Sequence, residues 1–290
     1  MLVKKEPDIG EKTPTNRYKE TEFEPLAPDF ILAIQEACGR FPAFKARFDR
    51  AGLDPHRLQY IQDLETLPLV HEFHAPPEEL PDISGWTEAL SVAGITADDI
   101  VQIGLSPGMS DLSRALDNSL SEIGAQGLLS GMAHFDIQMG IMKDLEVTAF
   151  IGELDFLQSL AELDEVRELG PGNGFSLETA FIIGDRADEQ HRKELEHILG
   201  VRIFMARHTP GFSCLGYECR YQAGFHWPEN ILVHIADRDS ELPVPVGETG
   251  DLVLTASTVP DPQSVRFNTG QLAYMPNQPC LCGKTIYRLA

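Results

Sequence analysis

Four short apolar runs decide the fold of this chain: Ile100-Val101-Gln102-Ile103, Val147-Thr148-Ala149-Phe150-Ile151, Ala180-Phe181-Ile182-Ile183 and Val201-Arg202-Ile203-Phe204-Met205-Ala206. Runs of this length that are rich in β-branched and aromatic residues are typical of strands. The segments between them carry helical patterns. In the clearest one, the apolar residues from Leu112 to Ile123 share one helix face, and Gly124 follows as the end signal. This alternation predicts an α/β fold with a mostly parallel sheet.

The chain after Pro210 follows a different pattern. Its strand-like segments are separated by turn residues rather than by helices, and they are Gly216–Tyr221, Ile231–Ala236, Asp251–Ala256 and Val265–Tyr274. We therefore divide the chain into an α/β portion, residues 29–209, and a β-rich, barrel-like portion, residues 210–290. Residues 1–28 are charged, carry four prolines and lack apolar periodicity. These properties indicate a loosely ordered arm.

The charge of the chain excludes several classes of partner. Its 290 residues leave room for a sizeable core, but 23 basic against 45 acidic residues give a net charge of −22. A chain this acidic repels nucleic-acid phosphates and anionic lipid headgroups. We therefore expect neither a nucleic-acid partner nor a membrane partner.

Other features of the sequence indicate a cytoplasmic protein. No apolar run approaches the ~20 residues that span a bilayer. The opening residues, Met1 to Pro7, lack the apolar core of a secretory signal. Five cysteines in such a chain are more typical of metal binding or free thiols than of a disulfide framework. We expect a soluble protein of the cytoplasm.

One set of cysteine and histidine residues has the composition of a zinc site. Cys219 and His226 are separated by six residues, and Cys280 and Cys282 by one. Together they offer four ligands for tetrahedral Zn²⁺, which would leave no open position for a catalytic water, so the metal would be structural. The alternative is that they are free thiols and a solvated histidine. Cys38 and Cys214 are interpreted as small buried hydrophobic residues.

Several stretches together resemble the phenylacetate-CoA ligase branch of the adenylate-forming (AMP-binding, acyl-CoA synthetase) superfamily. An opening segment, Phe41–Phe48 with Ala51–Pro55, is similar to the start of those enzymes. Pro245–Thr255 is similar to a glycine-rich turn and strand near their barrel. Arg266–Leu272 and Cys280–Thr285 are similar to two later motifs in the same order. The order and spacing of the motifs cover most of residues 29–290.

The resemblance implies both a fold and a chemistry. The fold is the large N-terminal domain of those ligases, an α/β portion followed by a barrel-like portion. The activity is AMP-forming carboxylate–CoA ligation, in which ATP activates an acid as an acyl-adenylate and the acyl group passes to coenzyme A. Related ligases carry a similar cysteine–histidine set, and family members often pair, which implies a homodimer. Because a fold does not carry function, the reactive positions need separate comparison.

The phosphate-binding loop expected from the resemblance is missing. Adenylation needs a Ser/Thr/Gly-rich loop with a lysine, because backbone N–H groups and a cation hold the triphosphate. This chain has eight lysines, and none lies in such a loop. Leu80-Pro81-Asp82 runs almost directly into Ile83–Trp86, which resembles the segment beyond the loop, so we expect a deletion. The remaining candidates, Ser106–Ser110 and Gly170–Gly174, lack a cation and are interpreted as turns.

Other positions of the expected active site are also altered. The magnesium-binding acid should follow Phe204-Met205-Ala206, but the residues there are Arg207-His208-Thr209-Pro210-Gly211. Gly184–Ala187 stands at the adenine segment. Gln271 replaces the aspartate that would hold the ribose hydroxyls. The small C-terminal domain with its catalytic lysine is expected to be absent, so no catalytic residue is assigned, ATP and CoA binding are doubtful, and no cofactor-binding residue is named.

Three hypotheses for function remain open. The first is a degenerate, zinc-stabilised relative of phenylacetate-CoA ligase without ATP-dependent adenylation, which binds an aromatic or acyl ligand or a protein partner. The second is a divergent aryl- or acyl-CoA ligase whose missing parts come from another chain. The third is a structural or scaffolding subunit. The sequence names neither the ligand nor the pathway.

Overall fold

The computed structural model describes residues 25–72, 84–106, 109–131, 134–164, 166, 174–184, 188–209, 212–256 and 262–290. Most of the expected arm, residues 1–24, lies outside the described residues. The helices are α1 (Pro28–Arg40), α2 (Pro42–Ala51), η1 (Ile61–Leu64), α3 (Ser84–Val92), α4 (Ser110–Ile123), α5 (Phe135–Asp144), α6 (Leu154–Ala161), α8 (Glu189–Leu199) and η3 (Pro262–Ser264). The strands are β1 (Ile100–Gly104), β2 (Gln126–Leu129), β3 (Ala149–Gly152), β4 (Thr179–Ile183), β5 (Arg202–Thr209), β6 (Phe212–Tyr217), β7 (Ile231–Ala236), β8 (Gly250–Ala256), β9 (Phe267–Tyr274) and β10 (Arg288–Leu289).

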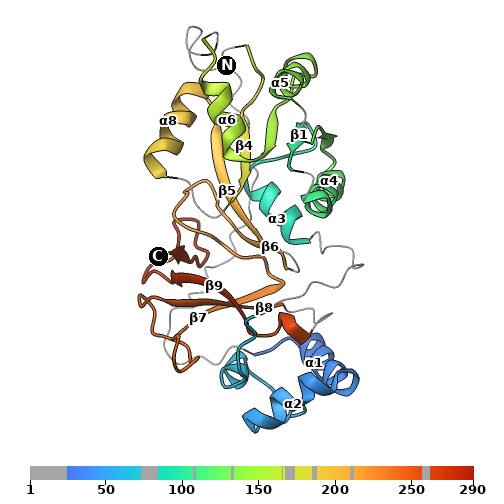
Figure 1. Cartoon of the computed structure of the whole chain (residues 1–290), viewed down its shortest axis with the longest axis vertical. Helices are drawn as coiled ribbons and strands as arrows, with labels where there is room; N and C mark the ends of the chain where they lie inside the picture. The colour runs from blue at the N-terminus through green and yellow to red at the C-terminus, as the bar shows by residue number, and fades with distance from the viewer. Residues whose placement is uncertain are drawn as a thin grey trace.

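The larger sheet has six strands in the order β2-β1-β3-β4-β5-β6. Strands β1 to β5 pair in parallel, and β6 pairs antiparallel with β5 at the edge. Figure 1 shows this sheet in the upper half of the molecule, with α6 and α8 on one side and α3 and α4 on the other. The predicted α/β fold with a mostly parallel sheet is confirmed.

Burial on both faces explains why the strands are apolar throughout. In β4, Ala180 and Ile182 pack in the core that contains Leu157 of α6 and Leu195 of α8. Phe181 and Ile183 of the same strand pack in the core that contains Trp86 of α3 and Leu116 of α4. Because successive side chains of a strand point to opposite faces, a sheet covered by helices on both sides selects continuous apolar runs.

The smaller sheet has four strands in the order β10-β9-β8-β7, all antiparallel, which is the predicted β-rich, half-barrel portion. The strand expected at 216–221 is wrong in its bounds and its sheet. The structure places β6 at Phe212–Tyr217, paired with β5 of the larger sheet, with Ala206 opposite Tyr217. The strand ends at Tyr217 because the next residues turn back, and Gln222 N–H bonds to the Cys219 carbonyl.

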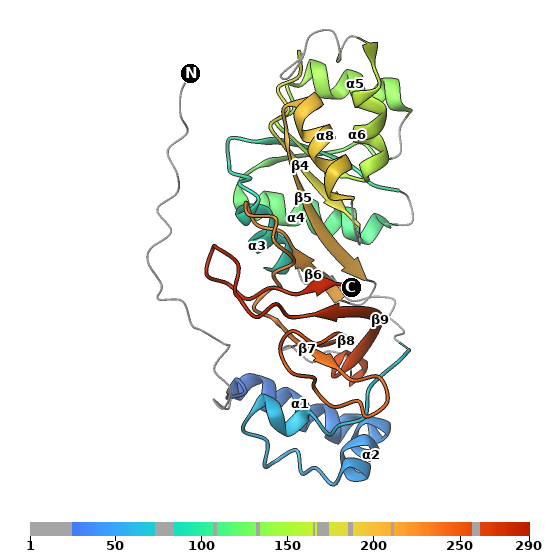
Figure 2. The same cartoon turned by 90° about the vertical axis from the view of Figure 1, so that its left-hand side faces the viewer.

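The N-terminal helices pack on the half-barrel as a third core. Phe44 and Phe48 of α2 meet edge to face and pack in the same cluster as Val265, just before β9. Figure 2 shows α1 and α2 beneath β7 to β9, at the end of the molecule opposite the six-stranded sheet.

Two arginines hold this helical segment in place. Arg47 of α2 donates to the carbonyls of Pro68, Val265 and Pro262, and Arg266 donates to the carbonyls of Leu64 and Glu241. Burial, and for Arg47 also the charge of Arg266, lowers the pKa of each guanidinium to about 10, so both remain charged at neutral pH.

Throughout the described residues, the helices are too short or too polar to cross a membrane.

Candidate metal centre

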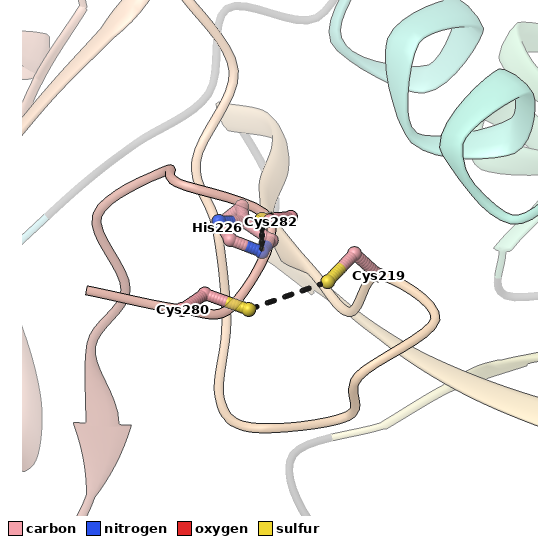
Figure 3. A group of neighbouring side chains, drawn as sticks. All are labelled: Cys219, His226, Cys280 and Cys282. Carbon is pink, nitrogen blue, oxygen red and sulfur yellow. Dashed lines mark hydrogen bonds between the residues drawn. The ribbon is translucent and has the colours of Figure 1, made fainter. Parts of the chain in front are cut away.

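The four predicted metal ligands lie together, although they come from two distant parts of the chain. The ligand atoms of Cys219, His226, Cys280 and Cys282 all lie within 4.8 Å of one another. Cys219 Sγ is 3.5 Å from Cys280 Sγ, and Cys282 Sγ is 3.5 Å from His226 Nε2. Figure 3 shows the four side chains pointing toward a common centre.

The first pair of ligands is placed by a turn after β6. Cys219 lies two residues beyond the end of the strand, and His226 returns to pair with Tyr217 through hydrogen bonds in both directions, each 2.9 Å. The return requires close backbone approach at Gly224, which has φ +149° and where a Cβ would lie 2.8 Å from the Tyr287 carbonyl oxygen. A side chain at position 224 would therefore push His226 away from the other ligands.

The second pair of ligands lies on a tight knuckle between β9 and β10. The Cys280 carbonyl accepts from Gly283 N–H at 2.8 Å, and Cys280 N–H donates to the Lys284 carbonyl at 3.0 Å. Gly283 has φ 87°, a left-handed conformation that turns the chain back after Cys282. Phe225 and Tyr287 exchange backbone hydrogen bonds of 2.9 Å, which join this knuckle to the Cys219–His226 turn.

The orientation of His226 suits it to bind a metal. The ring is 1% exposed, and its Nδ1 lies 2.8 Å from the Thr285 carbonyl oxygen. Because a carbonyl only accepts hydrogen bonds, Nδ1 carries the proton, and in the neutral ring Nε2 presents its lone pair to the thiols. Metal-binding histidines are commonly fixed by this kind of contact to a carbonyl.

The three thiols differ in environment. Cys219 and Cys280 are 4% and 3% exposed, whereas Cys282 is exposed to solvent. The pKa of Cys282 is lowered to about 3, chiefly because the Cys219 thiol donates a hydrogen bond to its thiolate. The same hydrogen bond, together with burial, raises the pKa of Cys219, and burial raises that of Cys280. Without a metal ion, one thiolate is thus stabilised by a neighbouring thiol. A bound metal ion would instead stabilise all three cysteines as thiolates.

Two of the donor spacings are close to those of tetrahedral Zn²⁺. Zinc–sulfur bonds of ~2.3 Å and zinc–nitrogen bonds of ~2.0 Å place two sulfurs ~3.8 Å apart and a sulfur and a nitrogen ~3.5 Å apart. The observed sulfur–sulfur distance of 3.5 Å and sulfur–nitrogen distance of 3.5 Å agree with this geometry to within a few tenths of an ångström. Three cysteines and one histidine would fill a tetrahedral coordination shell, which is the arrangement of structural zinc sites.

A polar contact beside the knuckle was not predicted from the sequence. Glu88 of α3 accepts hydrogen bonds from Tyr217 Oη at 2.6 Å and from Lys284 Nζ at 2.8 Å. Burial and the charge of Glu88 raise the pKa of Tyr217, so the phenol keeps its proton. These contacts connect the knuckle with α3 across 196 residues of sequence, and no local motif announces them.

The positions implied by the adenylation chemistry are only partly described. Gln271 lies half-buried on β9, and within the described part of the chain its Oε1 has no hydrogen-bond partner. At the end of β5, Arg207 is buried and donates to Tyr287 Oη at 3.0 Å, and the Trp86 ring lies against His208. Three sets of expected positions lie outside the described residues: 80–83, where a loop deletion was expected, the loop residues 107–108 and 170–173, and residues 185–187 of the expected adenine segment.

Comparison with known proteins finds distant similarity to CoA ligases. No profile of a known protein family matches it. A phenylacetate-coenzyme A ligase of Thermus thermophilus is 26% identical over 319 aligned positions, which cover 92% of this chain and 71% of that protein. The structure of a 2-hydroxyisobutyryl-CoA ligase in an open conformation, with 2-HIB-AMP and CoA, superposes with a TM-score of 0.74 at 19% identity over 90% of this chain and 71% of that one. A long-chain-fatty-acid-CoA ligase from Archaeoglobus fulgidus gives a TM-score of 0.55 at 12% identity over 70% of this chain and 46% of that one.

Proposed function

We propose that this chain, a distant homologue of phenylacetate-coenzyme A ligase whose fold matches adenylate-forming CoA ligases over about 90% of its length, has lost ATP-dependent adenylation. It keeps the ligase fold, stabilised by a structural zinc ion, to bind an aromatic or acyl ligand or a protein partner. The observation that carries this proposal is Gln271, a neutral amide on β9 where the resemblance puts the ribose-binding aspartate.

The charge pattern around the expected nucleotide position supports the proposal. A carboxylate is expected at the end of β5 to hold magnesium, but Arg207 and His208 stand there. A buried cation at this place would repel Mg²⁺ and would favour an anion instead. The two segments that remain as candidates for phosphate binding, Ser106–Ser110 and Gly170–Gly174, carry no lysine or arginine, which also supports the loss of adenylation.

The cysteine–histidine cluster supports the zinc part of the proposal. Cys219 follows a strand of the larger sheet, whereas Cys280 and Cys282 follow a strand of the half-barrel. An ion bound by both would tie the two sheets together. Closed zinc sites contribute folding free energy directly, because the unfolded chain lacks a preformed site.

The second candidate is a divergent aryl- or acyl-CoA ligase completed by another chain. One observation favours it: the buried Oε1 of Gln271 lacks a partner within the described residues. A ribose hydroxyl could donate to that oxygen, which would keep nucleotide recognition without the negative charge.

Pyrophosphate release tests the loss of adenylation, and ATP binding distinguishes the two candidates, because a ligase completed by another chain would still bind ATP by itself. The purified protein would be incubated with ATP, Mg²⁺ and a panel of aryl and fatty acids, beside an active phenylacetate-coenzyme A ligase as the positive control. We expect no pyrophosphate above the protein-free background and no heat of ATP binding in calorimetry. Acid-dependent pyrophosphate release would contradict the loss of adenylation and would support the ligase. Elemental analysis tests the metal separately, with one zinc per chain as the expected result.

A further inference from the structure

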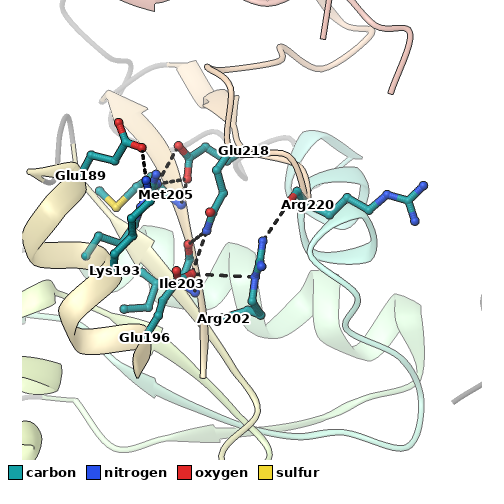
Figure 4. Close-up of polar contacts among 10 residues, drawn as sticks. Glu189, Lys193, Glu196, Arg202, Ile203, Met205, Glu218 and Arg220 are labelled. Atoms are coloured by element: carbon teal, nitrogen blue, oxygen red, sulfur yellow. Dashed lines mark hydrogen bonds and ion pairs between the residues drawn. The ribbon is translucent and has the colours of Figure 1, made fainter. Parts of the chain in front are cut away.

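We propose that Gln222 is a positioning residue of the metal centre, which fixes the Cys219 turn against β5 and α8 so that Cys219 reaches the other ligands. This inference rests on the metal-binding part of the proposed function and extends it to residues that do not touch the ion. Figure 4 shows the polar contacts that surround the turn.

Gln222 is held by hydrogen bonds from both its side-chain amide and its backbone N–H. Its Nε2 donates to the Ile203 carbonyl at 2.7 Å and to Glu196 Oε1 at 2.9 Å. Its own N–H donates to the Cys219 carbonyl at 2.8 Å, which closes the turn that begins at the ligand. Hydrogen bonds through Gln222 therefore link β5 to the backbone of Cys219.

The backbone of Gln222 indicates that these contacts constrain the turn. Its φ is 49°, a left-handed conformation that a residue with a Cβ adopts at a cost. Such a conformation persists where surrounding contacts hold it. The two hydrogen bonds of the amide are contacts of this kind. Without them, we expect the backbone at Gln222 to relax and Cys219 to move away from the other ligands.

Glu196 of α8 makes the anchor rigid. Its Oε1 accepts from Ile203 N–H at 2.9 Å as well as from Gln222. The carboxylate thus sits between the helix, the strand and the turn, with its side chain only 15% exposed. Three elements share one oxygen, so a shift of the turn would break a partly buried hydrogen bond.

The other side of Cys219 is anchored to the same strand. Glu218 exchanges hydrogen bonds of 2.9 Å with both backbone groups of Met205, through its own N–H and its carboxylate. The carboxylate also accepts from Arg192 of α8 at 2.7 Å, and both side chains are 7% exposed. Cys219 is therefore held between two contacts to the α/β portion, a buried one through Glu218 and a partly buried one through Gln222.

The matched test uses Gln222→Met, which keeps the length of the side chain and removes its donor. Gln190→Met is the control, because Gln190 of α8, the helix that carries Glu196, also donates to a glutamate, Glu194, at 3.3 Å but is exposed. Each full-length protein would be stripped of metal, and its Zn²⁺ affinity measured by competition with a chromophoric chelator. Co²⁺ absorption would report the geometry of the site, which a purely structural role in stability would leave unchanged.

We expect Gln222→Met to weaken Zn²⁺ binding by about 10- to 100-fold and to change the Co²⁺ spectrum, as is usual for residues that orient metal ligands. Gln190→Met should match the wild type in both measurements. Wild-type affinity and spectrum in Gln222→Met would overturn the positioning role while leaving the zinc site standing. A wild-type chain that binds no Zn²⁺ would overturn both the site and this inference.

A second variant decides the matter if Gln222→Met does not fold. Arg202→Met removes the hydrogen bond of 2.8 Å from Arg202 to the Arg220 carbonyl, inside the same turn, and the ion pair of 3.8 Å between Arg202 and Glu196. Its side chain is 53% exposed, so the substitution is tolerable for folding. Loss of these contacts should weaken Zn²⁺ binding by about 3-fold, and unchanged binding in this folded variant would overturn the claim that anchoring the turn to β5 and Glu196 positions Cys219.

Discussion

The half-barrel is joined to the rest of the molecule at two places that use different chemistry. At one, the proposed metal centre of Cys219, His226, Cys280 and Cys282 would link it to the six-stranded sheet. At the other, which we call the arginine joint, Arg47 and Arg266 link it to the N-terminal helices. Figure 2 shows the helices and the larger sheet at opposite ends of the half-barrel.

The two joints respond to different conditions. The arginine joint consists of N–H bonds to backbone carbonyls, three from Arg47 and two from Arg266. A guanidinium stays protonated near neutral pH, so the arginine joint needs no bound ion or other solute. The proposed metal centre would depend on reduced thiols and on an available ion. If the ion is bound, one end of the half-barrel is held under all conditions and the other end only while the metal is present.

The largest expected effect is at the arginine joint. Arg266→Met should lower the free energy of unfolding by about 3 kcal/mol, because it leaves two carbonyls without their donors in a buried setting. Arg266 itself is 1% exposed. Urea unfolding measures the change, and Arg57→Met is the control because the Arg57 side chain is 87% exposed. Equal midpoints for the two variants would show that the joint contributes little.

Cys282→Ser should have the next largest effect. The serine oxygen is a poor zinc ligand, so the variant should lose its zinc and melt roughly 5 °C lower, with the α/β portion still folded. Elemental analysis and a thermal melt followed by circular dichroism measure both results. Cys38→Ala is the control, since Cys38 packs in the core of the N-terminal helices and should leave the zinc content at one per chain. A Cys282→Ser protein with full zinc content would contradict the ligand assignment.

Chelation sharpens the contrast between the joints. A strong chelator should lower the Tm of the wild type by a similar few degrees, because it removes the ion from one joint only. Arg266→Met should show the same decrease, whereas Cys282→Ser should show none. A smaller decrease in Arg266→Met would mean that the two joints are coupled through the half-barrel.

The smallest effect is expected at Lys284. Its ion pair with Glu88 at 2.8 Å is 53% exposed on the lysine side, and pairs of this kind contribute about 0–1 kcal/mol. Lys284→Met should therefore keep its zinc and lose less than about 1 kcal/mol of stability. Equilibrium unfolding at low and high salt tests this. A large loss that persists in high salt would place the knuckle's support in packing rather than in charge.

Much of the fold was predictable because its signals are local. The strands β1, β3, β4 and β5 appear as continuous apolar runs, since helices cover both faces of the larger sheet. The sheet membership of β6 was not predictable, because a strand of mixed composition such as Phe212–Tyr217 fits either sheet. Its partner was decided by the short connection from β5, which favours a hairpin.

The sequence by itself determined the α/β and β-rich portions and which four residues could bind zinc. Both follow from residue type and spacing, because burial selects apolar runs and zinc selects thiolate and imidazole ligands. Only the tertiary structure decided that Glu88 supports the knuckle and that Gln222, Glu196 and Glu218 hold the turn. A polar side chain has many candidate partners in so acidic a chain, and only the packing of distant segments brings one of them within hydrogen-bond distance.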